Sequence, residues 1–166
     1  VKTNEPFEKH EHIIFYLDDG RTLRYHDVRK FGTFDLISKN HLDDFFLHLG
    51  PEPFEEGFNA TYLLSRARTK PVKNFLLDQS VVAGIGNIYV NEICFMTKIH
   101  PQRTVDTLNI GDFERIVEAT KKVLSKAIQL GGTTIRSYTS SLGVTGRFQN
   151  ELLVHGKLDE ECPACG

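Results

Sequence analysis

The sequence predicts an α+β fold in which strands come first and helices follow. Two strand-like runs, HIIFYL at 12–17 and TLRYHD at 22–27, flank DDGR, a glycine-containing turn typical of a hairpin. FGTFDLI at 31–37 is predicted as a third strand. From residue 42 the apolar residues recur at helical spacing, and this pattern continues to residue 130. A small sheet followed by a helical bundle is therefore expected.

The helical part has clear start and stop signals. Helices are predicted at 42–49, 59–67, 71–79, from 87 onward and at 110–130. Asn59 and Asn109 are suited to cap two of these helices, and Gly131 and Gly132 end the last one. The segment 137–150 is rich in Ser, Thr and Gly and is predicted to be a mobile loop. ELLVHGK at 151–157 is predicted as a short strand that leads to a Cys-x-x-Cys pair.

Composition indicates an ordinary soluble globular protein, with 40% hydrophobic and 25% charged residues. No apolar run approaches the roughly 18–20 residues of a membrane helix, so no membrane partner is expected. Three cysteines do not suggest a disulfide framework, which favours a reducing cytoplasm. Cys94 lies in an apolar helical stretch and is predicted to be a buried thiol.

The net charge of −2 conceals an uneven distribution along the chain. Residues 1–65 carry 7 basic and 12 acidic side chains, whereas residues 66–148 carry 12 basic and 6 acidic ones. The densest basic run is RARTKPVK at 66–73. Such a run is typical either of a solvated surface or of a phosphate-binding footprint.

The most informative segment is DQSVVAGIGNIYVNEICF at 78–95. Gly84 and Gly86 form a tight turn, and Asn87 opens an apolar helix. The first N–H groups of a helix have no intrahelical partner and lie at the positive end of its dipole, which suits a phosphate. A plain helix–helix turn with an Asn cap would give the same pattern. A dinucleotide fold is disfavoured because the third glycine and the βαβ frame are absent.

Three segments occur in an order and spacing that resemble formamidopyrimidine-DNA glycosylase: AGIGNIYVNEI, KIHPQR and LGGTTIRSY. The resemblance extends upstream through 8–36 and HLGPEPF, and downstream to VHGK and the Cys-x-x-Cys, so it covers nearly the whole chain. It implies a partial β-sandwich catalytic domain at 1–39 and a helix–two-turns–helix DNA-binding domain at 40–133. A lesion-recognition loop and linker at 134–150 and a truncated β-hairpin zinc finger at 151–166 would follow.

The resemblance also implies roles for individual residues. Asn87, with Gly86 in the same turn, and Lys73 match residues that grip phosphates beside the lesion, and Arg68 and His10 match further DNA contacts. Arg29 and Phe31 match a wedge that enters the base stack, where an Arg fork can pair with an exposed base edge. The segment expected to close over a flipped base contains Ser137, Tyr138, Thr139, Ser140, Gly143, Thr145 and Arg147.

The family's catalytic residues have no counterpart in this sequence. The N-terminal proline nucleophile, its neighbouring glutamate, a later lysine and an arginine of the finger cannot be assigned. Cys162 and Cys165 match half of a four-cysteine zinc site, and two ligands do not complete a structural site. Zn²⁺ is therefore expected in the complete protein and not in this chain.

The function implied is base-excision repair of oxidised purines in the bacterial cytoplasm, with double-stranded DNA containing an oxidised purine or abasic site as the partner of a monomer. The parent enzyme would also cleave the abasic strand, whereas this chain alone is expected to bind DNA without catalysis. Two alternatives remain open: an endonuclease VIII-like glycosylase for oxidised pyrimidines, and a DNA-binding module with no catalysis.

Overall fold

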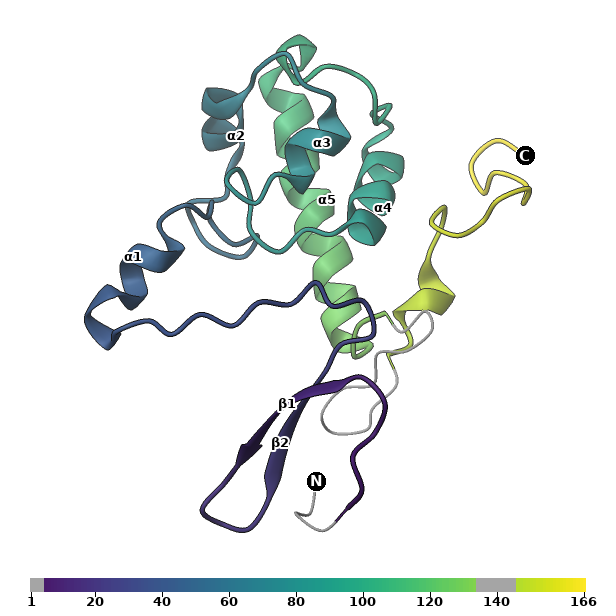
Figure 1. Cartoon of the computed structure of the whole chain (residues 1–166). Helices are drawn as coiled ribbons and strands as arrows, with labels where there is room; N and C mark the ends of the chain where they lie inside the picture. Colours follow the sequence, from purple (N-terminus) through teal and green to yellow (C-terminus); the bar gives the residue numbers. More distant parts are fainter. Residues whose placement is uncertain (1–4, 134–145) are drawn as a thin grey trace. The chain divides into compact units, whose positions relative to one another are not determined.

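The computed structural model describes residues 5–133 and 146–166. It divides the chain into two compact units, Val1–Leu42 and Asp43–Gly166 (Figure 1). In the described ranges, no helix is both long enough and apolar enough to cross a membrane.

The first unit is built on a β-hairpin. Strand β1 (Glu11–Tyr16) pairs antiparallel with β2 (Thr22–His26), with Ile14 opposite Arg24. Gly20 supplies the positive φ of 79° in the connecting turn, as the DDGR pattern predicts. The predicted hairpin is therefore confirmed. A second sheet is not found in the described part of this unit, so the sandwich stays a prediction.

The predicted third strand at 31–37 is wrong. The backbone there turns around the side chain of Asp27, whose carboxylate accepts a hydrogen bond from the Gly32 amide at 2.9 Å. An amide bonded to a side chain is not available to a strand ladder. Phe34 still reaches the hairpin, because its ring packs edge-on against Tyr25 with centroids 4.7 Å apart.

The second unit is helical. Its elements are α1 (Leu42–Phe46, which begins at the unit boundary), α2 (Ala60–Arg66), α3 (Val72–Leu77), α4 (Asn87–Thr97) and α5 (Ile110–Gln129). Short 3-10 turns occur at Lys39–His41 in the first unit and at Val105–Thr107 and Phe148–Glu151 in the second. All five predicted helices are present, although α1 ends three residues early.

Local signals explain where α2 and α5 begin. The Asn59 side chain accepts a hydrogen bond from the Tyr62 amide at 2.9 Å. Asn109 and Asp112 form a reciprocal capping box at the start of α5. Gly131 and Gly132, with φ of 74° and 85°, end α5. Both asparagine caps are therefore confirmed.

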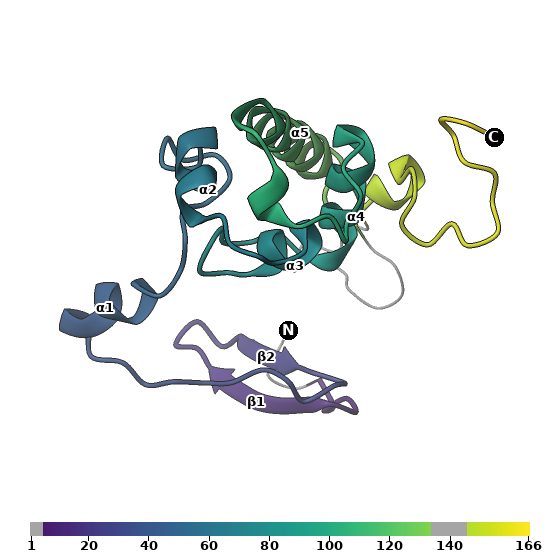
Figure 2. The same cartoon turned by 90° about the horizontal axis from the view of Figure 1, so that it is seen from above.

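The core of this unit forms around α5, which packs against both α2 and α4 (Figure 2). Buried side chains come from four helices, including Leu63 of α2, Phe75 of α3, Ile93 of α4 and Phe113 of α5. Cys94 is 4% exposed, which confirms the buried thiol. This core holds α3 and α4 and also buries Val81, Val82 and Ile85 of the connection between them, whereas Gly84 and Gly86 of the same connection are exposed.

The predicted strand at 151–157 is also wrong. A 3-10 turn occupies Phe148–Glu151, and bends follow it. The amides of Leu153, Val154 and His155 donate to the carboxylate of Glu92 rather than to a neighbouring strand. A long-range acceptor thus takes the hydrogen bonds that a ladder would need.

Candidate nucleic-acid interface

Two turns at residues 78–86 join α3 to α4, and Asp78 organises the first of them. One carboxylate oxygen accepts hydrogen bonds from the amide and hydroxyl of Ser80, at 3.1 and 2.7 Å. The other oxygen accepts a hydrogen bond from the Lys70 ammonium at 2.7 Å. These bonds, with the Lys70 contact the strongest, hold the pKa of Asp78 at about 2. The Lys70 ammonium is thus paired with a carboxylate of the first turn.

Gln79 organises the second turn. Its side-chain oxygen accepts a hydrogen bond from the Gly84 amide at 2.8 Å. Its side-chain nitrogen donates to the carbonyls of Leu77 and Ile85, at 3.1 and 3.3 Å. One amide side chain therefore connects the end of α3 to the residues before α4.

The turn faces open space at its two glycines. Gly84 has a φ of 87°, which favours glycine, whereas Gly86 is extended at φ −103° and ψ 173°. A Cβ atom added to either glycine would meet nothing within 4 Å. Gly86 caps α4 without any side-chain hydrogen bond, and Asn87 is exposed in the first turn. The start of α4 is accessible to a ligand from outside.

The first N–H groups of α4 point along the positive end of an 11-residue helix. Such an end binds phosphate groups, and the Asn87 side chain adds an amide beside it. Lys73 lies half-buried in the first turn of α3, and its amide donates to the Pro101 carbonyl at 3.1 Å. The two predicted phosphate contacts, Lys73 and Asn87, therefore each lie in the first turn of a helix.

A cleft of about 450 Å³ adjoins the first turn and is lined on one side by Arg66, Arg68 and Lys70. Arg68 donates to the Ala67 carbonyl at 2.6 Å, and Arg66 donates to the Ser80 carbonyl at 3.4 Å. Carbonyl partners do not neutralise a guanidinium. Because Lys70 is paired with Asp78, the two arginines are the better source of positive charge for an anionic ligand.

In the first unit, Asp27 builds a loop at the end of the hairpin. Its carboxylate accepts four hydrogen bonds of 2.9–3.0 Å, from the amides of Arg29, Lys30 and Gly32 and from the Tyr25 hydroxyl. Lys30 takes a positive φ of 55°. A Cβ on Gly32 would lie 1.5 Å from the Tyr25 hydroxyl oxygen, so a larger residue there would displace the Tyr25 ring from its hydrogen bond to Asp27. The conformation of 27–32 is thus tightly specified.

This loop presents the two predicted wedge residues to solvent. Phe31 is 75% exposed, and the Arg29 guanidinium lies over its ring, 4.6 Å from the centroid. An exposed aromatic ring under an arginine suits stacking on a base more than core packing. His10 lies at the base of the loop, where its carbonyl accepts a hydrogen bond from the Asp27 amide at 3.0 Å. The structure brings these three predicted contacts together within one unit.

The hydrogen bond from Gly32, followed by those from Tyr25, Arg29 and Lys30, holds the pKa of Asp27 at about 2 instead of 3.8. Since the folded-state pKa is depressed, the carboxylate stabilises the loop fully above about pH 4, and this contribution is lost as the pH falls towards 2. We expect the amide resonances of residues 29–32 to titrate with a midpoint near 2. A midpoint at the ordinary value of 3.8, or an unchanged titration in Asp27→Asn, would contradict this account of the loop.

Of the predicted lesion-loop residues, Arg147 lies within the described ranges. Arg147 is exposed, and its amide donates to the Leu130 carbonyl at 2.9 Å. The predicted lesion-loop residues that lie outside the described residues are Ser137, Tyr138, Thr139, Ser140, Gly143 and Thr145.

Cys162 and Cys165 lie in a turn in which the Gly166 amide donates to the Cys162 carbonyl at 2.9 Å. Hydrogen bonds from the Ala164 amide and from Cys165 lower the pKa of the Cys162 thiol. No group of three or more metal-ligating side chains occurs in the ranges that the structure covers.

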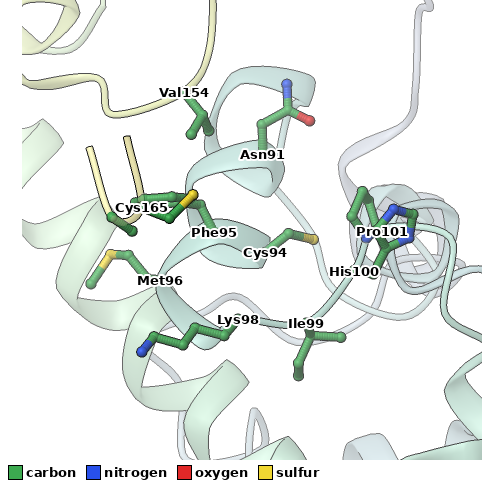
Figure 3. Close-up of a pocket in the computed structure, with 11 residues that line it drawn as sticks. Asn91, Cys94, Phe95, Met96, Lys98, Ile99, His100, Pro101, Val154 and Cys165 are labelled. Atoms are coloured by element: carbon green, nitrogen blue, oxygen red, sulfur yellow. The ribbon is translucent and has the colours of Figure 1, made fainter. Parts of the chain in front are cut away.

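A separate cleft of about 830 Å³ lies along α4, between this helix, the residues after it and the C-terminal segment (Figure 3). Phe95 and Met96 line it beside Cys165, and Cys94, whose thiol pKa is raised by burial to about 11, lies further along. None of the predicted DNA contacts lines this cleft. The cleft is therefore distinct from the turn at Gly84–Asn87.

Four side chains that hold the site or its surroundings in place were not recognised in the sequence: Asp27, Asp78, Gln79 and Glu92. Asp27 and Asp78 bond to amides within five residues, and a short polar residue at the start of a turn is a detectable signal for them. Gln79 also bonds to a nearby amide, that of Gly84, but glutamine is not typical of turns and gives no such signal. Glu92 bonds to residues more than 60 positions away, and nothing in its surroundings in the sequence indicates this.

Two turns between consecutive helices, open at the start of the second helix, define a helix–two-turns–helix protein. Residues 49–139 match the family described as "Formamidopyrimidine-DNA glycosylase H2TH domain". The chain belongs to the formamidopyrimidine-DNA glycosylase family.

Curated relatives and solved structures agree with this assignment. A formamidopyrimidine-DNA glycosylase of Listeria monocytogenes is 43% identical over 98% of this chain and 61% of its own length. One from Histophilus somni is 44% identical over all of this chain and 62% of its own length. The chain thus spans about three fifths of these relatives.

Two Lactococcus lactis structures superpose on 99% of this chain, which corresponds to 62% of their own length. One is a mutant of formamidopyrimidine-DNA glycosylase (Fpg) in complex with DNA containing Fapy-dG, with a TM-score of 0.91 and 43% identity. The other is Fpg in complex with DNA containing an abasic site, with a TM-score of 0.90 and 44% identity.

Proposed function

We propose that the complete protein is a base-excision repair glycosylase that removes oxidised purines, 8-oxoguanine and formamidopyrimidines, from duplex DNA. It would then cleave the abasic strand by β,δ-elimination. The observation that carries this proposal is the turn at Gly84–Asn87, which is fixed from within by Gln79 and open to solvent. The relatives' names, and the lesion DNA bound in the Lactococcus lactis structures, support the choice of substrate.

In this proposal the two units contact DNA in different ways. The start of α4, together with Asn87, Lys73 and Arg68, binds backbone phosphates, which positions the protein without reading sequence. His10 adds a contact from the hairpin unit. Arg29 and Phe31 enter the base stack, where the ring covers an unstacked step and the guanidinium bonds to the unpaired base.

Catalysis would depend on residues outside this chain. A terminal amine would attack the sugar, and a carboxylate and an ammonium would move protons. None of these groups is assigned to residues 1–166, so this chain alone is proposed to bind DNA and not to cleave it.

Zinc is the cofactor expected for the complete protein, and Cys162 and Cys165 fit half of its site. Their turn brings two thiols to one side of a short loop, and the thiolate of Cys162 is stabilised by backbone amides. A closed structural site takes four ligands, so two more would come from beyond these residues. Bound zinc would fix the geometry of the finger.

The test is borohydride trapping on a duplex with 8-oxoguanine opposite cytosine, with a gel mobility shift of the same samples. For this chain we expect a salt-sensitive shift without a covalent adduct, and for the complete protein an adduct as well. Absence of any shift at low salt would overturn DNA binding. An adduct that forms only with an oxidised pyrimidine would replace the proposed substrate by that of endonuclease VIII.

A further inference from the structure

Glu92 is a buried carboxylate that the proposed DNA contacts do not use. It lies in the middle of α4 and is only 2% exposed. Its oxygens accept hydrogen bonds from three successive amides, those of Leu153 at 2.8 Å, Val154 at 3.1 Å and His155 at 2.8 Å. Successive amides that converge in this way form a concave anion-binding site. Here a side chain of the same protein occupies that site.

A buried charge is tolerated only where hydrogen bonds replace its water. The three amides do so for Glu92, and a carboxylate is the side chain best suited to them, because it accepts at both oxygens and donates at neither. Glutamine has nearly the same shape, but its amide group would direct a donor at other donors. The contact therefore depends on charge and not only on size.

Further contacts hold the same segment on α4. The side-chain amide of Asn91 lies 2.9 Å from the Nδ1 atom of His155. Figure 3 shows Val154 near the end of α4 that carries Asn91, and the Val154 amide bonds to the neighbouring Glu92. Nearer the start of the helix, the ring of Phe148 packs against Tyr89 with centroids 5.6 Å apart. The residues from 148 to 155 are thus attached to α4 at two levels.

We propose that Glu92 is a positioning residue that makes α4 and residues 148–155 one rigid element. This rests on the proposed function, in which the start of α4 would bind phosphate. The attached segment begins directly after the exposed Arg147 and leads towards the Cys162–Cys165 turn. If the segment were loose, DNA binding would have to order it, and that entropy would reduce the affinity.

The test uses Glu92→Gln in the 166-residue chain, with Glu118→Gln as the matched control, because Glu118 is exposed on α5. Hydrogen exchange is measured at the amides of 153–155 and at core amides of α4 and α5. Affinity for a lesion duplex is measured across salt concentrations. We expect faster exchange at 153–155 with core protection retained, and an affinity loss of about fivefold. The salt slope should be unchanged because no phosphate contact is removed.

A second variant covers the case in which Glu92→Gln disturbs the core. Leu153→Pro removes one of the three donors from the surface side, and the preceding Leu152 already has a ψ of 131°, which suits a residue before proline. It should change exchange and affinity in the same direction.

Unchanged exchange at 153–155 in Glu92→Gln, or faster exchange with unchanged DNA affinity, would overturn the positioning role. If the unmodified chain did not bind DNA, the proposed function would fail instead. The exchange rates at 153–155 would still show whether Glu92 holds that segment on α4.

Discussion

Replacing Lys73 and Asn87 together by alanine is expected to lower the affinity for duplex DNA about 100-fold near 0.1 M salt. Hydrogen bonds to a charged group contribute about 1.5 kcal/mol each, and about 1.4 kcal/mol corresponds to a tenfold change. Both residues lie in the first turn of a helix, where alanine is a good helix former, so the fold should be retained. Fluorescence anisotropy with a labelled lesion duplex gives the affinities directly.

The two single variants should differ in their response to salt. Lys73→Ala removes a cation, which should reduce the slope of log affinity against log salt by about 1, whereas Asn87→Ala should leave the slope unchanged. Lys122→Ala is the matched control, because Lys122 is exposed on α5 and lines a cleft with Met96 and Thr97, at the far end of α4 from Gly86. A loss of affinity in the control equal to that in Lys73→Ala would indicate unspecific attraction by net charge.

The two glycines of the turn are expected to respond differently to the same substitution. Gly84→Ala should lower the free energy of unfolding by about 1–2 kcal/mol, because alanine is strained at a φ of 87°. Gly86→Ala should leave stability nearly unchanged, because its backbone is extended and no atom lies within 4 Å of the added Cβ. The methyl group would instead occupy the space in front of α4, and DNA affinity should fall at least about tenfold by loss of the helix-end contact.

Thermal or denaturant unfolding and DNA titrations of both variants check this pair. The decisive variant is Gly86→Ala, in which DNA affinity should fall while the free energy of unfolding stays nearly unchanged. Unaltered DNA affinity in Gly86→Ala would mean that the start of α4 does not face the DNA backbone.

Most of the fold could be predicted because its signals are local. The asparagine caps, the glycine stops and the helical spacing each depend on residues within one or two turns of one another, and the structure confirms them. The two errors, strands at 31–37 and 151–157, have one cause. At 31–37 the Gly32 amide bonds to the Asp27 carboxylate, and at 151–157 three successive amides bond to the Glu92 carboxylate. The apolar pattern of a strand does not show that a side chain takes these donors.

The candidate site was predictable to a different extent. Gly84, Gly86 and Asn87 were found from the residues alone, because a glycine turn before a helix has a physical meaning. The wedge required the family resemblance, since Phe31 taken alone looks like a core residue, and only the structure gives its exposure of 75%. Gln79 and Glu92 act through contacts that exist only in the folded chain.

The most direct test of the central claim is an NMR titration of the labelled chain with a lesion duplex. We predict the largest shift changes at the amides of Gly84, Gly86 and Asn87, with a second group at residues 29–32 of the hairpin loop. Changes concentrated at Phe95, Met96 and Cys165, around the other cleft of α4, with the glycine turn unaffected, would contradict the account.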